Sequence, residues 1–172
     1  MATVLQTELE RFVEGFRNEH RAARDVLLAM MQAFRDRDAA RIGELMARLD
    51  AGVGPHMRYE EEVMYPALTA VFGADYVERM LEDHDRGFGM AGRLMELASG
   101  NPISDQDVLE ANRLIQRQLP HITDCDGLVL AIEVLPDERQ RVLFEARDRA
   151  ISEGLSMTQW GERRGRQPIP AA

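Results

Sequence analysis

The sequence predicts an all-α protein, built as an up-down four-helix bundle with a short additional C-terminal helix and a tail. Apolar residues recur at every third or fourth position through most of the chain, which is typical of amphipathic helices, and strand signals are absent. The histidines also form two matched pairs: His20 and His84 are 64 residues apart, and His56 and His121 are 65 apart. This spacing indicates a duplicated helical hairpin with two imidazoles in each copy.

The first hairpin is expected in the N-terminal half of the chain. Apolar residues at threes and fours predict one long amphipathic helix over residues 4–34. A second helix begins near Ala39 and meets Pro55. Because proline lacks a backbone donor and clashes with the preceding turn, we expect a kink or a break there. The helix then resumes and ends before Gly73.

The second hairpin is expected after Gly73. A third helix spans about residues 74–97, and Ser104 is a good N-cap for a fourth, with Asp107 completing a capping-box-like start. The fourth helix passes through Pro120, directly before His121. It supplies the second imidazole of this hairpin.

The C-terminal part is expected to add little to the bundle. Pro136 favours the start of a shorter helix that ends near residue 151. We therefore predict one bundle domain over residues 1–153 and a tail over 154–172. In this tail we expect Trp160 to anchor on the bundle and the arginines to be solvated.

Composition excludes several classes of function. The net charge of −9 argues against nucleic acid, whose binding needs a basic face. A single cysteine excludes an internal disulfide and makes a reducing compartment the default. The N-terminus lacks the basic region of a signal peptide, and no apolar run approaches the length of about 18 residues that spans a membrane. We expect a cytoplasmic protein with no membrane partner, and its oligomeric state stays open.

His56 and Glu60 carry the clearest chemical signal. Residues four positions apart project from the same helix face one turn apart, so both side chains can bind one cation, or the carboxylate can bridge two. Bundles with metal cores place their ligands inward from several helices in this way. Imidazole and carboxylate ligands suit iron, zinc, copper or manganese. The sequence therefore predicts a metal site in the bundle core.

The segment over residues 56–66, HMRYEEEVMYP, closely resembles the central motif of the hemerythrin-like, or HHE cation-binding, family. That motif is a His, a Glu four residues later, a second Glu, and then apolar residues and Pro. Three further segments are similar to the other helix sites of the family, and the resemblance covers roughly residues 5–150: Glu19-His20, Glu82-Asp83-His84 and Leu119-Pro120-His121.

The resemblance implies an up-down four-helix bundle with two non-haem irons, bridged by carboxylates and an oxo or hydroxo group. Members bind or sense dioxygen, handle iron or nitric oxide, or reduce peroxide, so the implied partner is dioxygen or another small oxidant. The metal ligands that the resemblance implies are His20, His56, Glu60, His84, His121 and Asp126.

Phe88 is one departure from the family pattern. Oxygen-carrying members have a second His four residues after the position of His84, and here that residue is Phe88. One metal would then lack a protein ligand, and an open position on a metal is what substrate or solvent needs. The same loss is consistent with weak binding, a single metal, or replacement by a nearby acid.

The residues after His121 are the other departure. Many members have Glu four residues later, where this chain has Cys125, whereas oxygen carriers use an Asp five residues later, which matches Asp126. Five residues turn an ideal helix by about 140°, whereas Asp124 lies only about 60° from His121. A π-bulge would rotate Asp126 inward. We favour Asp126 as the ligand, with Asp124 as the alternative.

Three classes of function stay open from the sequence. A reversible oxygen binder or sensor forms a stable complex without turnover, whereas a di-iron oxidoreductase consumes peroxide, oxygen or nitric oxide. A helical interaction module with one metal or none is the third class. No catalytic residue is assigned. Glu61 is expected as a solvated acid and Tyr59 as a packing residue, with a role beside the metal ligands as the alternative for both.

Overall fold

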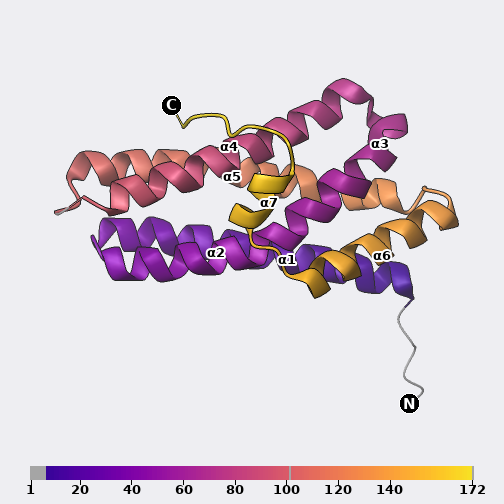
Figure 1. The fold of residues 1–172 in the computed structure, drawn as a ribbon, viewed down its shortest axis with the longest axis horizontal. Helices are drawn as coiled ribbons and strands as arrows, with labels where there is room; N and C mark the ends of the chain where they lie inside the picture. Colours follow the sequence, from indigo (N-terminus) through magenta and orange to yellow (C-terminus); the bar gives the residue numbers. More distant parts are fainter. Residues whose placement is uncertain (1–6, 101, 172) are drawn as a thin grey trace, which may run out of the picture.

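The computed structural model describes residues 7–100 and 102–171, and within these ranges it contains helices and no strand. Figure 1 shows their arrangement. The elements are α1 (Glu8–Arg35), α2 (Ala39–Tyr59), the π-helical turn η1 (Glu60–Met64), α3 (Tyr65–Phe72), α4 (Ala74–Ala98), α5 (Asp105–Ile132), α6 (Asp137–Glu153) and α7 (Met157–Arg163).

Two antiparallel helix pairs make up the bundle. Helix α1 packs on α2 and on α5, and α4 packs on α5 and on the rod formed by α2, η1 and α3. Helix α6 packs against α2, and the short α7 lies across the middle of the molecule against α2 and α4 (Figure 1). The prediction of an all-helical up-down bundle is confirmed, and none of the described helices is long and apolar enough to cross a membrane.

The starts of the helices follow the sequence closely. Ser104 caps α5 as predicted: its side chain accepts from the backbone of Asp107, whose carboxylate accepts from the Ser104 backbone in return. Helix α6 ends at Gly154, which adopts a left-handed φ of 60° and turns the chain toward α7. Gly54 then allows this segment to lie directly on α2, because a Cβ at Gly54 would be 2.2 Å from the carbonyl oxygen of Leu155.

The break expected at Pro55 is absent, since α2 runs without interruption to Tyr59. A proline ring deprives the carbonyl one turn earlier of its partner, and here that carbonyl belongs to Ala51, which is exposed. Water can therefore satisfy it without breaking the helix. The irregular turn comes later, at η1, and helix α5 stays α-helical through Pro120 and Asp126.

The hydrophobic core consists of two clusters with a polar layer between them. One cluster lies toward the α1–α2 turn and includes Met30, Phe34, Ile42, Leu94 and Ile115. The other lies toward α6 and includes Phe16, Met64, Leu68, Val129 and Leu143. The four histidines occupy the sequence positions at which each long helix passes from one cluster to the other. The apolar clusters therefore fix the backbone on both sides of the polar layer.

Residues 154–171, which we expected to form a tail, include the helix α7. Met157 and Trp160 are buried on the bundle, which agrees with the expected anchoring role of Trp160. The expectation of solvated arginines is wrong for Arg164, whose side chain is only 1% exposed. Its partners are buried carboxylates, which sequence periodicity could not indicate.

Candidate metal centre

Four helices bring the four histidines to one level of the bundle. His20 comes from α1, His56 from α2, His84 from α4 and His121 from α5, and all four side chains are buried. They line one cavity of about 70 Å³. The two matched pairs of histidines in the sequence thus form one cluster in the structure.

His20, His56 and Glu60 form the tightest group in the cluster. The Nε2 atom of His56 lies 2.9 Å from Nε2 of His20 and 3.2 Å from Oε1 of Glu60. One ligand atom from each of these buried residues lies within 4.8 Å of the others, which is close enough to hold one metal ion. Among residues 7–100 and 102–171, this is the only such group of three.

Glu60 also reaches the other pair of histidines. Its Oε2 atom lies 3.3 Å from Nε2 of His84, and the rings of His84 and His121 are in edge contact with centroids 4.9 Å apart. Glu60 is fully buried, and Oε2 has no hydrogen-bond partner. Since a buried carboxylate oxygen without a hydrogen bond is costly, this atom marks a place where a cation fits.

The π-helical turn η1 begins at Glu60. It widens the helix at two consecutive acids that both contact histidines. Glu60 contacts Nε2 of His56 and of His84. Glu61 contacts Nδ1 of His84, the ring nitrogen that faces away from the centre. Such turns are frequent at functional sites. We expected a π-bulge in the last helix, and the structure has it in this segment instead.

The outer nitrogen of every histidine faces a carboxylate. This arrangement fixes each ring and leaves Nε2 of His20, His56 and His84 directed at the centre, as outer-shell carboxylates do in metal sites. The Nδ1-to-carboxylate distances are 3.5 Å for His20 with Asp126, 2.7 Å for His56 with Glu19, 2.7 Å for His84 with Glu61, and 3.4 Å for His121 with Asp83.

Glu19 is the best-supported of these outer carboxylates. It accepts from the Tyr59 hydroxyl at 2.7 Å and from Nε of Arg147, on α6, at 3.0 Å. Burial opposes the charge on Glu19, but its bonds with His56 and Tyr59 outweigh burial and hold its pKa below the usual value. Tyr59, expected as a packing residue, is therefore also part of this network.

Tyr65 and Cys125 bring a hydroxyl and a thiol to the centre. The thiol of Cys125 donates to Oε1 of Glu60 at 2.8 Å, and the Tyr65 hydroxyl lies 3.2 Å from Nε2 of His84. Burial raises the pKa of both groups, so both keep their protons at neutral pH. The Cys125 thiol thus contacts Glu60, the carboxylate that lies between the two histidine pairs.

Within each histidine pair, one imidazole favours its proton and the other does not. Burial and the neighbouring His56 lower the pKa of His20 to about 4, whereas the carboxylates of Glu60 and Glu19 outweigh burial and raise the pKa of His56 to about 10. Likewise, burial lowers the pKa of His121, and the carboxylates around His84 raise its pKa. In each pair, carboxylates thus favour the proton of one imidazole, while burial disfavours the proton of the other.

Asp126 lies outside the cluster of Nε2 atoms. Its Oδ1 atom faces the outer nitrogen of His20, its Oδ2 atom is 3.7 Å from Nε of Arg17, and its side chain is 39% exposed. Helix α5 has no π-bulge to turn it inward. Asp124 is exposed, and the carboxylate that faces His20 is that of Asp126. The ligand role predicted for Asp126 stays a prediction, and this placement favours an orienting role.

Phe88 does not occupy a ligand position. Its ring packs against Gly161 of α7 and under the Arg164 guanidinium, whose carbon is 4.7 Å from the ring centroid. It borders a surface groove between α4 and α7 and is not part of the lining of the histidine cavity. Phe88 therefore supplies no ligand to the centre, and the open metal position expected from its presence stays a prediction.

The sequence did not indicate the contacts of three acids with histidines as the first expectation. Glu61, expected as a solvated acid with a role beside the metal ligands as the alternative, is only 6% exposed and contacts His84. Glu19 and Asp83 were noted only as acids beside histidines, although the Glu-His and Asp-His dipeptides place an acid on the neighbouring helix face. The dipeptides are the signal that could have identified them.

Comparison with known proteins agrees with this geometry. The family model of the hemerythrin HHE cation-binding domain matches residues 11–132. The matched range contains the four histidines, Glu60 and the four outer carboxylates, and it leaves α6 and α7 outside. No curated protein and no solved structure matches the chain.

Proposed function

Because the chain belongs to the hemerythrin HHE cation-binding family, we propose that its four histidines and Glu60 hold two non-haem irons, and that this centre binds or reacts with dioxygen or a related small oxidant. Family membership supplies the cation. The choice of iron, the number of ions and the small oxidant are our proposal.

The position of Glu60 carries the proposal. Its two oxygens lie within 3.3 Å of Nε2 of His56 and of His84, which belong to different hairpins. A carboxylate shared between two imidazole pairs suits two adjacent cations better than one. The same Oε2 atom has no hydrogen-bond partner, so a cation would supply the interaction that the protein does not.

The donor set is compatible with iron, and the family's association with small oxidants is the reason for choosing it. Imidazole nitrogens and a carboxylate suit iron, zinc, copper or manganese, and a centre with few protein ligands leaves positions for small molecules. Bound iron would supply a redox-active Lewis acid. The histidines would hold it through Nε2, and the outer carboxylates would hold the rings in place.

The volume of the surrounding cavity limits the size of the molecule that can reach the centre. It measures about 70 Å³, and apart from the histidines and Gln118 its lining is apolar, including Leu27, Met57, Met90 and Met157. Such walls offer water few hydrogen bonds, and the volume leaves room for a small molecule only. This is why we propose dioxygen or an oxidant of similar size rather than an organic substrate.

An oxidoreductase is the second candidate. Cys125 and Tyr65 hold protons beside Glu60 and His84, and consumption of peroxide or dioxygen requires proton donors at the centre. A reversible binder does not need them. These two residues are the observation that favours turnover.

A single metal ion is the third candidate. Only His20, His56 and Glu60 place three ligand atoms within 4.8 Å of one another in the part of the chain that the structure describes. The pair of His84 and His121 would have to move slightly to complete a second site. A mononuclear centre would use the first group alone.

Metal analysis of anaerobically purified protein, followed by visible spectra after addition of oxygen and then of peroxide, tests the proposal. We expect iron in the protein and new absorption on exposure to oxygen. Absorption that persists favours a binder, whereas absorption that cycles while peroxide disappears favours an oxidoreductase. A protein that takes up no iron under these conditions would contradict the proposal.

A further inference from the structure

Arg164, which directly follows α7, is buried against the bundle. Its Nε atom donates to Oε2 of Glu61 at 2.8 Å, and its Nη1 atom donates to Oδ1 of Asp85 at 2.5 Å. The guanidinium lies over the ring of Phe88, and its side chain is 1% exposed. Arg164 therefore joins α7 to two acids, one on η1 and one on α4.

Glu61 connects Arg164 to a histidine of the metal centre. The Oε1 atom of Glu61 lies 2.7 Å from Nδ1 of His84, and Oε2 accepts from both Arg164 and Nε1 of Trp160. The path from Arg164 through Glu61 ends at His84, whose Nε2 faces Glu60. Each link is a hydrogen bond between buried groups.

Arg164 supplies a cationic partner to the buried carboxylate of Glu61. A buried carboxylate without a cationic partner is strongly unfavourable, and Glu61 is only 6% exposed. The planar fork of arginine can serve two carboxylates at once, which the single ammonium of lysine cannot reproduce. Asp85 has a second partner in Arg166, at 2.7 Å, whereas among the arginines only Arg164 is bonded to Glu61.

The same arrangement recurs at His56. Its outer carboxylate, Glu19, is held by Arg147 on α6, just as Glu61 is held by Arg164 beyond α7. Both arginines lie after residue 132, outside the range that matches the family model. His56 and His84, which both contact Glu60, thus have outer carboxylates that are bound by arginines of the C-terminal segment, which we define as residues 133–171.

We infer that Arg164 is a positioning residue of the metal centre, which holds Glu61 against Nδ1 of His84 and so directs Nε2 of His84 at the second metal position. The inference rests on the proposed function, because it assigns Arg164 a role in metal binding. It makes the C-terminal segment, and not only the bundle, a part of the centre.

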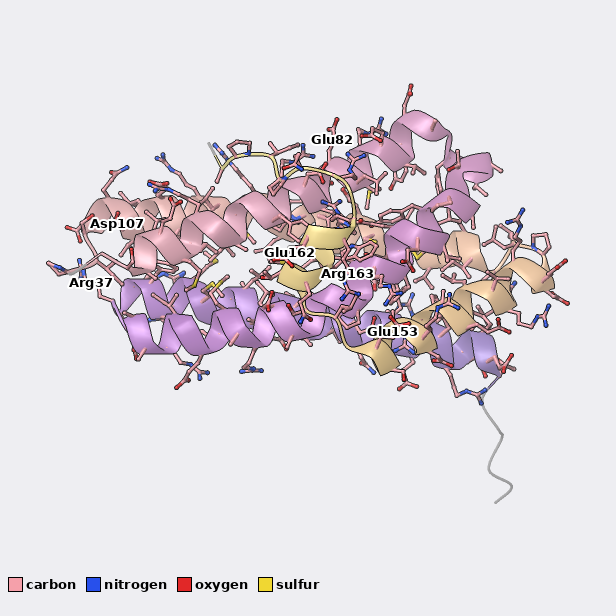
Figure 2. All side chains as sticks on the ribbon, viewed as in Figure 1. Arg37, Glu82, Asp107, Glu153, Glu162 and Arg163 are labelled. Carbon is pink, nitrogen blue, oxygen red and sulfur yellow. The ribbon has the colours of Figure 1, made fainter. Side chains whose placement is uncertain are left out.

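Stepwise titration of the metal-free protein with cobalt(II), followed by visible absorption, tests this role. Arg164→Gln should weaken the second cobalt equivalent by about 10- to 100-fold and shift its absorption bands, while the first equivalent is unchanged. Arg164→Lys keeps the charge without the fork and should give an intermediate affinity. Arg163→Gln is the matched control, because Arg163 is the neighbouring residue and is exposed on α7 (Figure 2).

A double-mutant cycle with Glu61→Gln separates positioning from a general loss of packing. If Arg164 acts through Glu61, the double variant should lose little more metal affinity than the more affected single variant. Parent-like titrations of Arg164→Gln, or fully additive losses, would overturn the inference while the proposed function stands. A parent chain that binds no metal ion would overturn both. Should Arg164→Gln not fold, as circular dichroism would reveal, Arg164→Lys decides by the same criteria.

Discussion

The carboxylate of Glu60 lies 3.2 Å from Nε2 of His56, the residue one helical turn before it, and the two side chains are buried together. This oxygen, Oε1, therefore faces the pair of His20 and His56. The second oxygen extends to the other pair, where it has no hydrogen-bond partner. The candidate centre is built around this one side chain.

Glu60→Gln should remove most of the bound metal and leave a helical protein. The amide keeps the volume but loses the charge that attracts two cations, whereas the apolar clusters on either side carry most of the folding energy. Metal content and far-ultraviolet circular dichroism measure the two effects. Glu62→Gln, at a partly exposed acid paired with Arg58, is the control. Full occupancy in Glu60→Gln would show that Glu60 is not a bridging ligand.

Metal binding to the group of His20, His56 and Glu60 should release about one proton at pH 7. His20 has a pKa of about 4 and is already neutral, whereas His56, with a pKa of about 10, must lose its proton before Nε2 can bind a metal. The apparent affinity should therefore rise about tenfold per pH unit between pH 6 and pH 8. Calorimetry in buffers of different ionisation enthalpy counts the protons. An affinity independent of pH would contradict the assignment of His56.

Asp126→Asn should weaken metal binding by about tenfold without lowering the occupancy at saturating metal. The expected reason is that Asp126 faces Nδ1 of His20 and orients that ring from outside. Equilibrium titration measures the effect, with Asp124→Asn, at an exposed acid two residues earlier, as the control. Loss of one metal equivalent in Asp126→Asn would instead restore the ligand role that the family resemblance implies.

Phe88→His should leave the metal spectrum unchanged and lower the stability of the protein by about 1 kcal/mol. The new imidazole would lie beside Gly161 and Arg164, away from the histidine cavity, and would replace an apolar contact. Visible spectra of the iron-loaded variant and thermal unfolding measure both effects, and Phe88→Leu controls for the lost ring. A changed spectrum at full occupancy would mean that residue 88 does reach the metal.

The helices and the five central residues could be predicted from the sequence because both obey a period. Apolar spacing identified the helices of the bundle, and the matched spacing of the histidine pairs predicted that His20, His56, His84 and His121 lie at one level. The segment HMRYE, in which Glu60 follows His56 by four residues, predicted Glu60 as the fifth central residue. Each of these signals depends only on residues within one helix or on matching distances between helices.

The positions of Arg164, Phe88 and η1 could not be predicted from the sequence, because they depend on contacts between distant segments that no local pattern indicates. Arg164 lies in the end of the chain over residues 161–172, GERRGRQPIPAA, whose arginines and prolines are typical of a solvated tail. Only the buried acids Glu61 and Asp85 explain its position. Phe88 was assigned by counting from His84, yet it faces α7, a helix that the family pattern does not contain. The π-helical turn η1 likewise has no distinct sequence signal.

Quantitative iron analysis after anaerobic loading with excess iron(II) and removal of unbound metal tests the central claim most directly. The account predicts two irons per parent chain, because the two oxygens of Glu60 face imidazoles of two different histidine pairs. In Glu60→Gln the bound iron should fall below one equivalent per chain. A reproducible single iron in the parent chain, unaffected by further loading, would contradict the binuclear centre and leave the group of His20, His56 and Glu60 as a mononuclear site.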